Sequence, residues 1–429
     1  MKRIALSLAL AAASLGASAQ DLLIRGATVH TAGPQGTLRD ADVLVQGGVI
    51  RAVGPGLSAP AGVAVVDARG RPLTPGLFAG LTGIGLEEVS AEQPTNDTTV
   101  VLGAPAPGIV AQTRPEFDVT LAYNPRSTLV PVTRIEGLTY TVLAAGTAPG
   151  GSIIAGQGGA VRLDGGYEVP YAGRRALFVN LGGALAALTG NSRAGQYLLL
   201  QQAIDEARGR GLPAGSQGAL LTPAGRSTLA GYLDRRGKVV ITVDREADIR
   251  QVLKLAEREK LDLVLTGAAE GWRVARELAA AKVPVFVDGL ANLPTSFDSL
   301  AATLENAARL HAAGVPVSFT QGGDASHNAR KVRQLAGNAV AHGLPWEAGL
   351  AGLTRVPAEA FGLADRLGSI EVGKRADLVL WSGDPLDVAH AAEQVWIDGR
   401  AIPMRSRQTE LRDRYLRAPG PLPRAYPAR

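Results

Sequence analysis

Strand-like and helix-like segments alternate strictly in the second half of this chain, between residues 239 and 342. Four short β-branched runs each precede an amphipathic stretch of helical period. The expected strands are 239–243, 263–265, 283–287 and 315–319, and the expected helices are 245–260, 270–282, 299–313 and 328–342. Alternation at this spacing requires parallel strands joined by right-handed crossovers, so it predicts an α/β fold.

Both ends of the chain show a different pattern, with short β-branched segments bounded by Gly or Pro. We expect strands over 22–30, 41–50 and 63–66, and again over 376–381 and 395–400. Neither end holds enough strands to close a core alone, so the two ends are expected to pair into one small β-domain. The section 87–180 is rich in Gly, Pro and Thr, and is interpreted as an elaborated set of loops.

The first residues have the pattern of a cleavable leader. Lys2 and Arg3 precede an apolar run, and Ala17-Ser18-Ala19 offers a small-x-small cleavage site, so residues 1–19 are expected to be removed on export. The run is too short to span a bilayer. We therefore expect a periplasmic or secreted protein with no membrane span.

Composition excludes several classes of function. The chain has no Cys, which excludes disulfides, thiol nucleophiles and Cys-ligated metals. A net charge of +5 over 429 residues does not argue for nucleic acid. The Gly-rich run 155–161 lacks the Lys of a phosphate-binding loop and is interpreted as a tight turn that leads into a strand.

Three stretches together resemble the amidohydrolase superfamily, with imidazolonepropionase-like and prolidase-like members nearest. They are 65–78 (VVDARGRPLTPGLF), 353–363 (LTRVPAEAFGL) and 367–386 (LGSIEVGKRADLVLWSGDPL). The resemblance implies a TIM-like (β/α)8 barrel over 76–362 and a β-sandwich composed of 20–75 and 363–402, followed by a basic Pro-rich tail over 403–429. It also implies hydrolysis of amide or cyclic amide C–N bonds of a small molecule, a zinc or other divalent metal, and a homodimer.

The positions that match the family's metal ligands carry other residues. In place of the expected His ligands stand Leu81, Gly83, Thr242 and Gly267. No Lys occurs between residues 2 and 238 to serve at the fourth strand, and Asp324 matches the eighth-strand Asp only with a shift of about two residues. The sequence thus predicts that the inherited metal site is lost and that the chain holds no metal cofactor.

One of the five His follows the carboxyl end of a predicted barrel strand, where barrel chemistry is located. This residue is His327, and together with Asp324 it is the predicted catalytic pair, acting as a general acid or an anion-binding group. Asn328, Asp244 and Glu270 are the predicted substrate-binding residues. Three of these five residues have a structural alternative: a polar loop residue or a helix-start contact for His327, a helix N-cap for Asp324 and a favourable charge at a helix start for Glu270.

Two functions remain open at this point. One is an exported amidohydrolase-like hydrolase with an altered or absent metal. The other is a non-catalytic pseudoenzyme that binds a small ligand or a protein partner through the barrel mouth.

Overall fold

The computed structural model describes residues 21–102, 113–171 and 174–416. The predicted leader and the end of the tail lie outside these residues. Within them, no helix is both long and apolar enough to cross a membrane.

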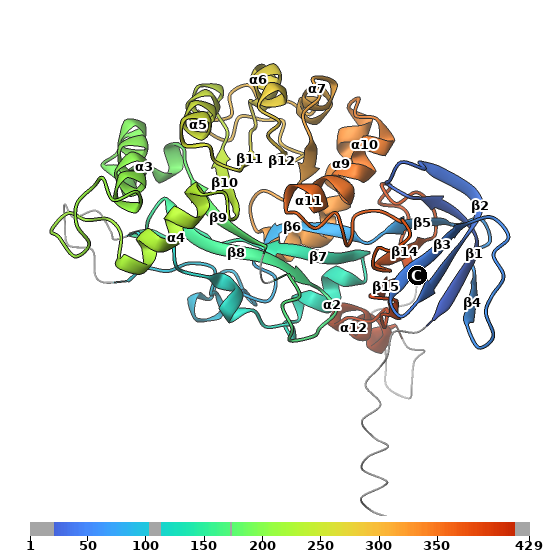
Figure 1. Cartoon of the computed structure of the whole chain (residues 1–429). Helices are drawn as coiled ribbons and strands as arrows, with labels where there is room; N and C mark the ends of the chain where they lie inside the picture. The colour runs from blue at the N-terminus through green and yellow to red at the C-terminus, as the bar shows by residue number, and fades with distance from the viewer. Residues whose placement is uncertain (1–20, 103–112, 172–173, 417–429) are drawn as a thin grey trace, which may run out of the picture.

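Strands from both ends of the chain form one mixed sheet (Figure 1). Its members are β1 (Leu22–His30), β2 (Thr37–Gln46), β3 (Val49–Gly54), β4 (Ala64–Asp67), β5 (Pro72–Pro75), β14 (Leu378–Trp381), β15 (Ala392–Ile397) and β16 (Arg400–Ala401). The two ends meet where β5 pairs antiparallel with β14. The sheet branches at β1, which pairs with β2 on one side and with β4 and then β5 on the other.

The prediction of one continuous strand over 41–50 is wrong. This segment contains the end of β2, a two-residue turn and the start of β3. Gly47 and Gly48 form that turn with φ of +59° and +77°. Two consecutive positive φ values close a tight hairpin, and two adjacent glycines are the signal that marks one.

A second sheet of eight strands forms the barrel. In spatial order, which is also sequence order, its strands are β6 (Leu77–Thr82), β7 (Leu138–Leu143), β8 (Ile154–Arg162), β9 (Arg175–Asn180), β10 (Lys238–Val243), β11 (Leu263–Gly267), β12 (Val285–Val287) and β13 (Val317–Phe319). The outermost strands, β6 and β13, come together where the Leu81 N–H donates to the Thr320 Oγ1 at 3.0 Å. The sheet is therefore nearly closed, which confirms the predicted TIM-like barrel with an additional domain.

The section 87–180 is more regular than its composition indicates, because it contains α2 (Leu129–Arg134), β7, β8 and β9. β8 runs antiparallel to both of its neighbours, so this part of the barrel departs from strict βα alternation. The Gly-rich run expected to be a turn lies inside β8. A Cβ at Gly158 would lie 1.8 Å from the Leu143 carbonyl oxygen, so the strand pairs with β7 only because the residue is Gly.

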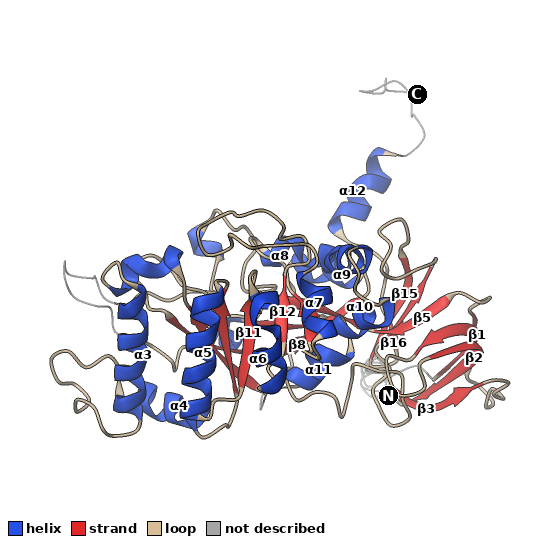
Figure 2. Cartoon of the chain, turned by 90° about the horizontal axis from the view of Figure 1, so that it is seen from above, coloured by secondary structure: helices blue, strands red, loops and turns tan. Residues whose placement is uncertain are grey.

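Helices cover the outside of the barrel, and α3, α5, α6 and α7 follow one another along it in both views (Figures 1 and 2). The helices after α2 are α3 (Arg193–Ala207), α4 (Pro223–Leu233), α5 (Glu246–Glu259), α6 (Ala275–Ala280), α7 (Asn306–Ala312), α8 (Ala325–Asn328), α9 (Val332–Ala341), α10 (Trp346–Gly352), α11 (Arg355–Ala360) and α12 (Arg407–Tyr415). Short 3-10 turns are η2 (Gln93–Thr95), η3 (Val119–Ala122), η4 (Gly183–Thr189), η5 (Gly271–Val274) and η6 (Ala329–Lys331).

The helix expected over 299–313 forms only over 306–312, as α7. Residues before it form turns, and the Ala301 N–H donates to the Glu270 Oε1 at 3.0 Å instead of entering a helix. This hydrogen bond between distant residues outweighs the local helix propensity of residues 299–305.

Alternate residues of the barrel strands face two different cores. Phe178, Val240 and Val264 belong to the inner cluster, which also contains Phe78 and Phe286. Their neighbours along the strands, such as Leu177, Val239 and Leu263, pack with the outer helices. Burial on both faces explains why these strands are continuously hydrophobic.

Candidate active site at the barrel mouth

A cavity of about 730 Å³ opens at the carboxyl ends of the barrel strands. Its volume lies within the usual range for small-molecule sites, and its position is where barrels of this type hold their chemistry. Five polar side chains reach it from the ends of four strands, β9, β10, β12 and β13, or from the loops after them. These residues are Asn180, Thr242, Asp244, Asp288 and Thr320.

Asp244, one of the predicted substrate-binding residues, follows β10 and lines this cavity. Burial raises the pKa of its carboxyl group. The Ala269 N–H donates to Oδ1 at 3.2 Å and lowers the pKa in part, whereas the nearby Asp298 and Glu270 carboxylates raise it further. The group is thus suited to exchange a proton with a ligand in the cavity.

Asp288 stands directly after β12 and also lines the cavity, although sequence reasoning missed it. Its Oδ1 accepts from the Leu290 N–H at 2.9 Å, and its Oδ2 accepts from the Gly322 N–H at 3.0 Å. The carboxylate therefore joins the loops after β12 and β13. The available signal was its place directly after a predicted strand, the same position that identified Asp244.

Two neighbouring strand ends carry a hydrogen-bonded chain of neutral groups. The Thr242 hydroxyl donates to the Asn180 Oδ1 at 2.7 Å, and the Asn180 amide donates to the Thr147 Oγ1 at 2.8 Å. These bonds fix the orientation of the Asn180 amide at the cavity wall.

Beside the mouth, three titratable side chains converge. Glu87, Asp324 and His327 each offer a ligand atom, and these atoms lie within 4.8 Å of one another. Asp324 directly precedes α8 and has a left-handed φ of +51°. Its Oδ1 lies 3.0 Å from the His327 Nδ1, so the carboxylate contacts the imidazole and does not cap the helix.

The imidazole and Glu87 are held in place by further partners. The His327 Nε2 donates to the Glu88 carbonyl at 3.1 Å, and the Nδ1 on the other side of the ring faces the Asp324 Oδ1. The Ser326 hydroxyl donates to the Glu87 Oε2 at 2.8 Å and accepts from the Gly83 N–H at 3.0 Å. Supporting hydrogen bonds of this kind are typical of metal-binding His and carboxylate groups.

The positions that match the family's His ligands are filled differently. Leu81 lines the cavity with an apolar side chain. A Cβ at Gly83 would lie 2.7 Å from the Thr98 Cγ2 and 3.0 Å from the Ser326 Oγ, and one at Gly267 would lie 2.6 Å from the Asp244 Oδ1. The side chains that surround the two glycines occupy the space that His side chains would need.

The other two predicted substrate-binding residues lie away from the cavity lining. Both carboxylate oxygens of Glu270 accept from backbone amides, from Glu246 at 2.9 Å and Ala301 at 3.0 Å. Glu270 therefore links the start of α5 to the segment before α7, whereas the structural alternative placed its charge at the start of its own helix. Asn328 ends α8, where its N–H donates to the Asp324 carbonyl at 3.1 Å.

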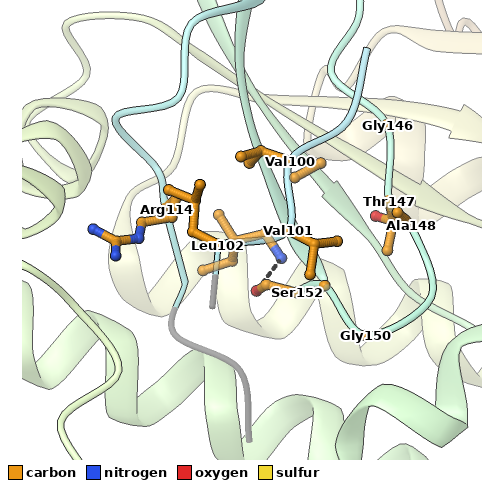
Figure 3. Close-up of a pocket in the computed structure, with 12 residues that line it drawn as sticks. Val100, Val101, Leu102, Arg114, Gly146, Thr147, Ala148, Gly150 and Ser152 are labelled. Carbon is orange, nitrogen blue, oxygen red and sulfur yellow. Dashed lines mark hydrogen bonds between the residues drawn. The ribbon is translucent and has the colours of Figure 1, made fainter. Parts of the chain in front are cut away.

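A second hollow lies next to the end of β7 (Figure 3). Gly146, Thr147 and Ser152 contribute to its wall, and Ser152 accepts from the Ile154 N–H at 3.1 Å. Its volume is about 10 Å³, which admits a water molecule but no substrate. We therefore place ligand binding in the larger cavity.

Comparison with known proteins agrees with this architecture. Residues 248–402 match the amidohydrolase family. Over 74 residues the chain is 47% identical to amidohydrolase tasK of Hapsidospora irregularis, a match that covers 17% of this chain and 8% of that protein. The chain thus spans under a tenth of that relative's length.

Two solved structures share the fold. An amidohydrolase from Thermotoga maritima aligns with a TM-score of 0.76 and 24% identity, over 90% of this chain and all of that one. An adenosine deaminase from Xanthomonas campestris with bound zinc aligns with a TM-score of 0.52 and 20% identity, over 89% of this chain and 92% of that one.

These findings overturn the expectation that the chain holds no metal cofactor. A structural neighbour contains zinc, and Glu87, Asp324 and His327 form a donor set of one imidazole and two carboxylates that suits a divalent ion. The prediction failed because it tested the inherited positions, whereas Glu87 lies in an irregular loop that only the fold brings to His327. The family match over residues 248–402 and the fold shared with solved amidohydrolases agree with the terminal motifs, and together they support the resemblance to the amidohydrolase superfamily.

Proposed function

We propose that this protein hydrolyses a C–N bond of a small molecule bound in the barrel mouth. The observation that carries the proposal is the convergence of Glu87, Asp324 and His327 beside a substrate-sized cavity. The loop after β13 links the two features, because Gly322 and Gly323 line the cavity and Asp324 follows them directly.

Glu87, Asp324 and His327 are the residues that would hold a divalent ion. Such an ion supplies a water of lowered pKa and polarises a carbonyl group. The chain's own contribution is to fix the donors: the Glu88 carbonyl sets the tautomer of His327, and Ser326 orients Glu87.

Asp244 is the proposed proton-transfer group. It lies in the cavity, one of its oxygens is engaged by the Ala269 N–H, and burial raises its pKa, which makes the carboxylate a better proton acceptor. Asn180 and Thr242, fixed by their mutual hydrogen bond, are placed to orient the polar end of a substrate.

The second candidate function is a pseudoenzyme that binds a ligand without turnover. Leu81, Gly83 and Gly267 favour it, because the inherited ligand positions carry no donor atoms. The two functions share the cavity and differ in catalysis. We also propose export through the leader 1–19, which rests on the sequence pattern.

The test is metal content combined with hydrolysis of a panel of small amides and cyclic amides, with purified mature protein. We expect about one divalent ion per chain, and His327→Ala should lose both the ion and the activity. His311→Ala is the matched control, because His311 is an exposed His on α7. Metal retained by His327→Ala contradicts the assigned ligand set. Saturable binding of the amides without hydrolysis, by metal-loaded protein, favours the pseudoenzyme.

A further inference from the structure

The charge distribution of the mouth cavity indicates which ligands it accepts. Among the described residues that line it, the two ionisable side chains are the carboxylates of Asp244 and Asp288. Lys, Arg and His contribute nothing to this lining. A cavity of this composition favours positive charge in a bound molecule and disfavours a carboxylate.

The guanidinium groups of Arg193 and Arg245 do not offset these acids, because other carboxylates engage them. Arg193 pairs with Asp248 at 2.7 Å and also with Asp298. Arg245 forms two hydrogen bonds to Asp248, at 3.0 and 3.1 Å. The carboxylate of Glu270, which accepts from the backbone amides of Glu246 and Ala301, adds to the negative potential around Asp244.

The lining of the same cavity includes two solvent-exposed leucines. Leu290 and Leu293, on the loop after β12, line the cavity while 40% and 69% of their surfaces stay exposed to solvent. The hydrogen bond from the Leu290 N–H to the Asp288 Oδ1 holds the start of this loop against the acid. Exposed Leu side chains beside a fixed carboxylate match a ligand with an apolar part close to a positive charge.

We propose that the mouth selects substrates that carry a protonated amine and an adjoining apolar group, with the amine at Asp244 and Asp288 and the apolar group on Leu290 and Leu293. This inference rests on the proposed function in that it names the substrate class of the same cavity. The inference concerns substrate recognition alone, whereas the proposed function concerns catalysis. Binding measured without turnover therefore tests the inference separately.

The experiment compares three probes of nearly equal shape at neutral pH: phenethylammonium, phenethyl alcohol and phenylacetate. Their dissociation constants are measured on the whole mature protein by ligand-observed NMR. A charge-assisted hydrogen bond contributes about 1.5–3 kcal/mol, so phenethylammonium should bind roughly 10- to 100-fold more tightly than phenethyl alcohol. Phenylacetate should bind most weakly.

Asp244→Asn should reduce the preference for phenethylammonium over phenethyl alcohol about tenfold, because it removes the charge and keeps the shape. Asp288→Asn is the second variant and should act in the same direction. Asp262→Asn is the matched control: Asp262 pairs with Lys238 at 2.8 Å, next to the amino end of β10, at the opposite end of the barrel. Leu293→Ser should weaken the three probes by the same factor.

Equal binding of phenylacetate and phenethylammonium overturns the inference, and so does a charge preference that survives both Asp substitutions. Failure of phenethylammonium to saturate in the millimolar range overturns it as well. A protein that discriminates charge but hydrolyses no amide keeps this inference and loses the proposed function. A protein that hydrolyses an amide but shows no charge preference keeps the proposed function and loses this inference.

Discussion

Replacing Gly267 by Ala should destabilise the protein and displace Asp244. Gly267 ends β11 with φ of +83°, and a Cβ there would lie 2.6 Å from the Asp244 Oδ1. The left-handed backbone costs an Ala about 1–2 kcal/mol. The Asp244 carboxylate must also move and lose its hydrogen bond from Ala269, which adds about 1–3 kcal/mol. The total expected loss in the free energy of unfolding is about 2–5 kcal/mol.

Gly314→Ala separates these two contributions. Gly314 has φ of +91°, and nothing lies within 4 Å of its Cβ position, so the variant incurs the backbone cost alone. Urea unfolding should therefore rank Gly267→Ala well below Gly314→Ala in stability. Adding Asp244→Ala to Gly267→Ala should recover about 1–3 kcal/mol as a coupling energy. Equal losses at the two glycines, with no coupling to Asp244, would refute the claim that Asp244 fills the space of the missing ligand.

Three further outcomes are expected. Gly158→Ala should prevent β8 from pairing with β7 and leave the protein largely insoluble on expression, because its Cβ would lie 1.8 Å from the Leu143 carbonyl oxygen. Deleting the residues after Arg366 should lower the melting temperature of the whole chain, since β14 pairs with β5; an unchanged melting temperature counts against a shared terminal sheet. The raised pKa of Asp244 means that its carboxyl is more easily protonated in the folded than in the unfolded state. Its contribution to the free energy of unfolding therefore falls as pH rises above 3.8. Asp244→Asn should flatten this pH dependence in urea titrations at several pH values.

The part of the fold that sequence predicted well has strong local periodicity. The helix expected over 245–260 appears as α5 at Glu246–Glu259, with Ile249, Val252 and Leu255 on its buried face and acidic residues in its first turn. The strand expected over 239–243 appears as β10. Here propensity, pattern and packing agree, and such segments are the ones that a single sequence specifies.

The part that sequence missed depends on contacts between distant residues. The glycines of β8 predict a turn. In the structure Gly158 is required because the β7 backbone approaches too closely for a side chain at this position. Glu87 has no local signature, and it reaches His327 only because Ser326 and Gly83 hold the two loops together, 243 residues apart in sequence. His327 and Asp324 were found because strand ends in a barrel converge, a rule that depends on topology and not on loop conformation.

The most direct test of the account is anomalous diffraction at the zinc edge from crystals of the mature protein grown with zinc. The proposed ligand set predicts one strong peak bound by the His327 Nδ1 and by oxygens of Glu87 and Asp324, with the Nε2 still hydrogen-bonded to the Glu88 carbonyl. A peak held elsewhere, such as between Asp244 and Asp288, or no peak in zinc-saturated crystals, would contradict it.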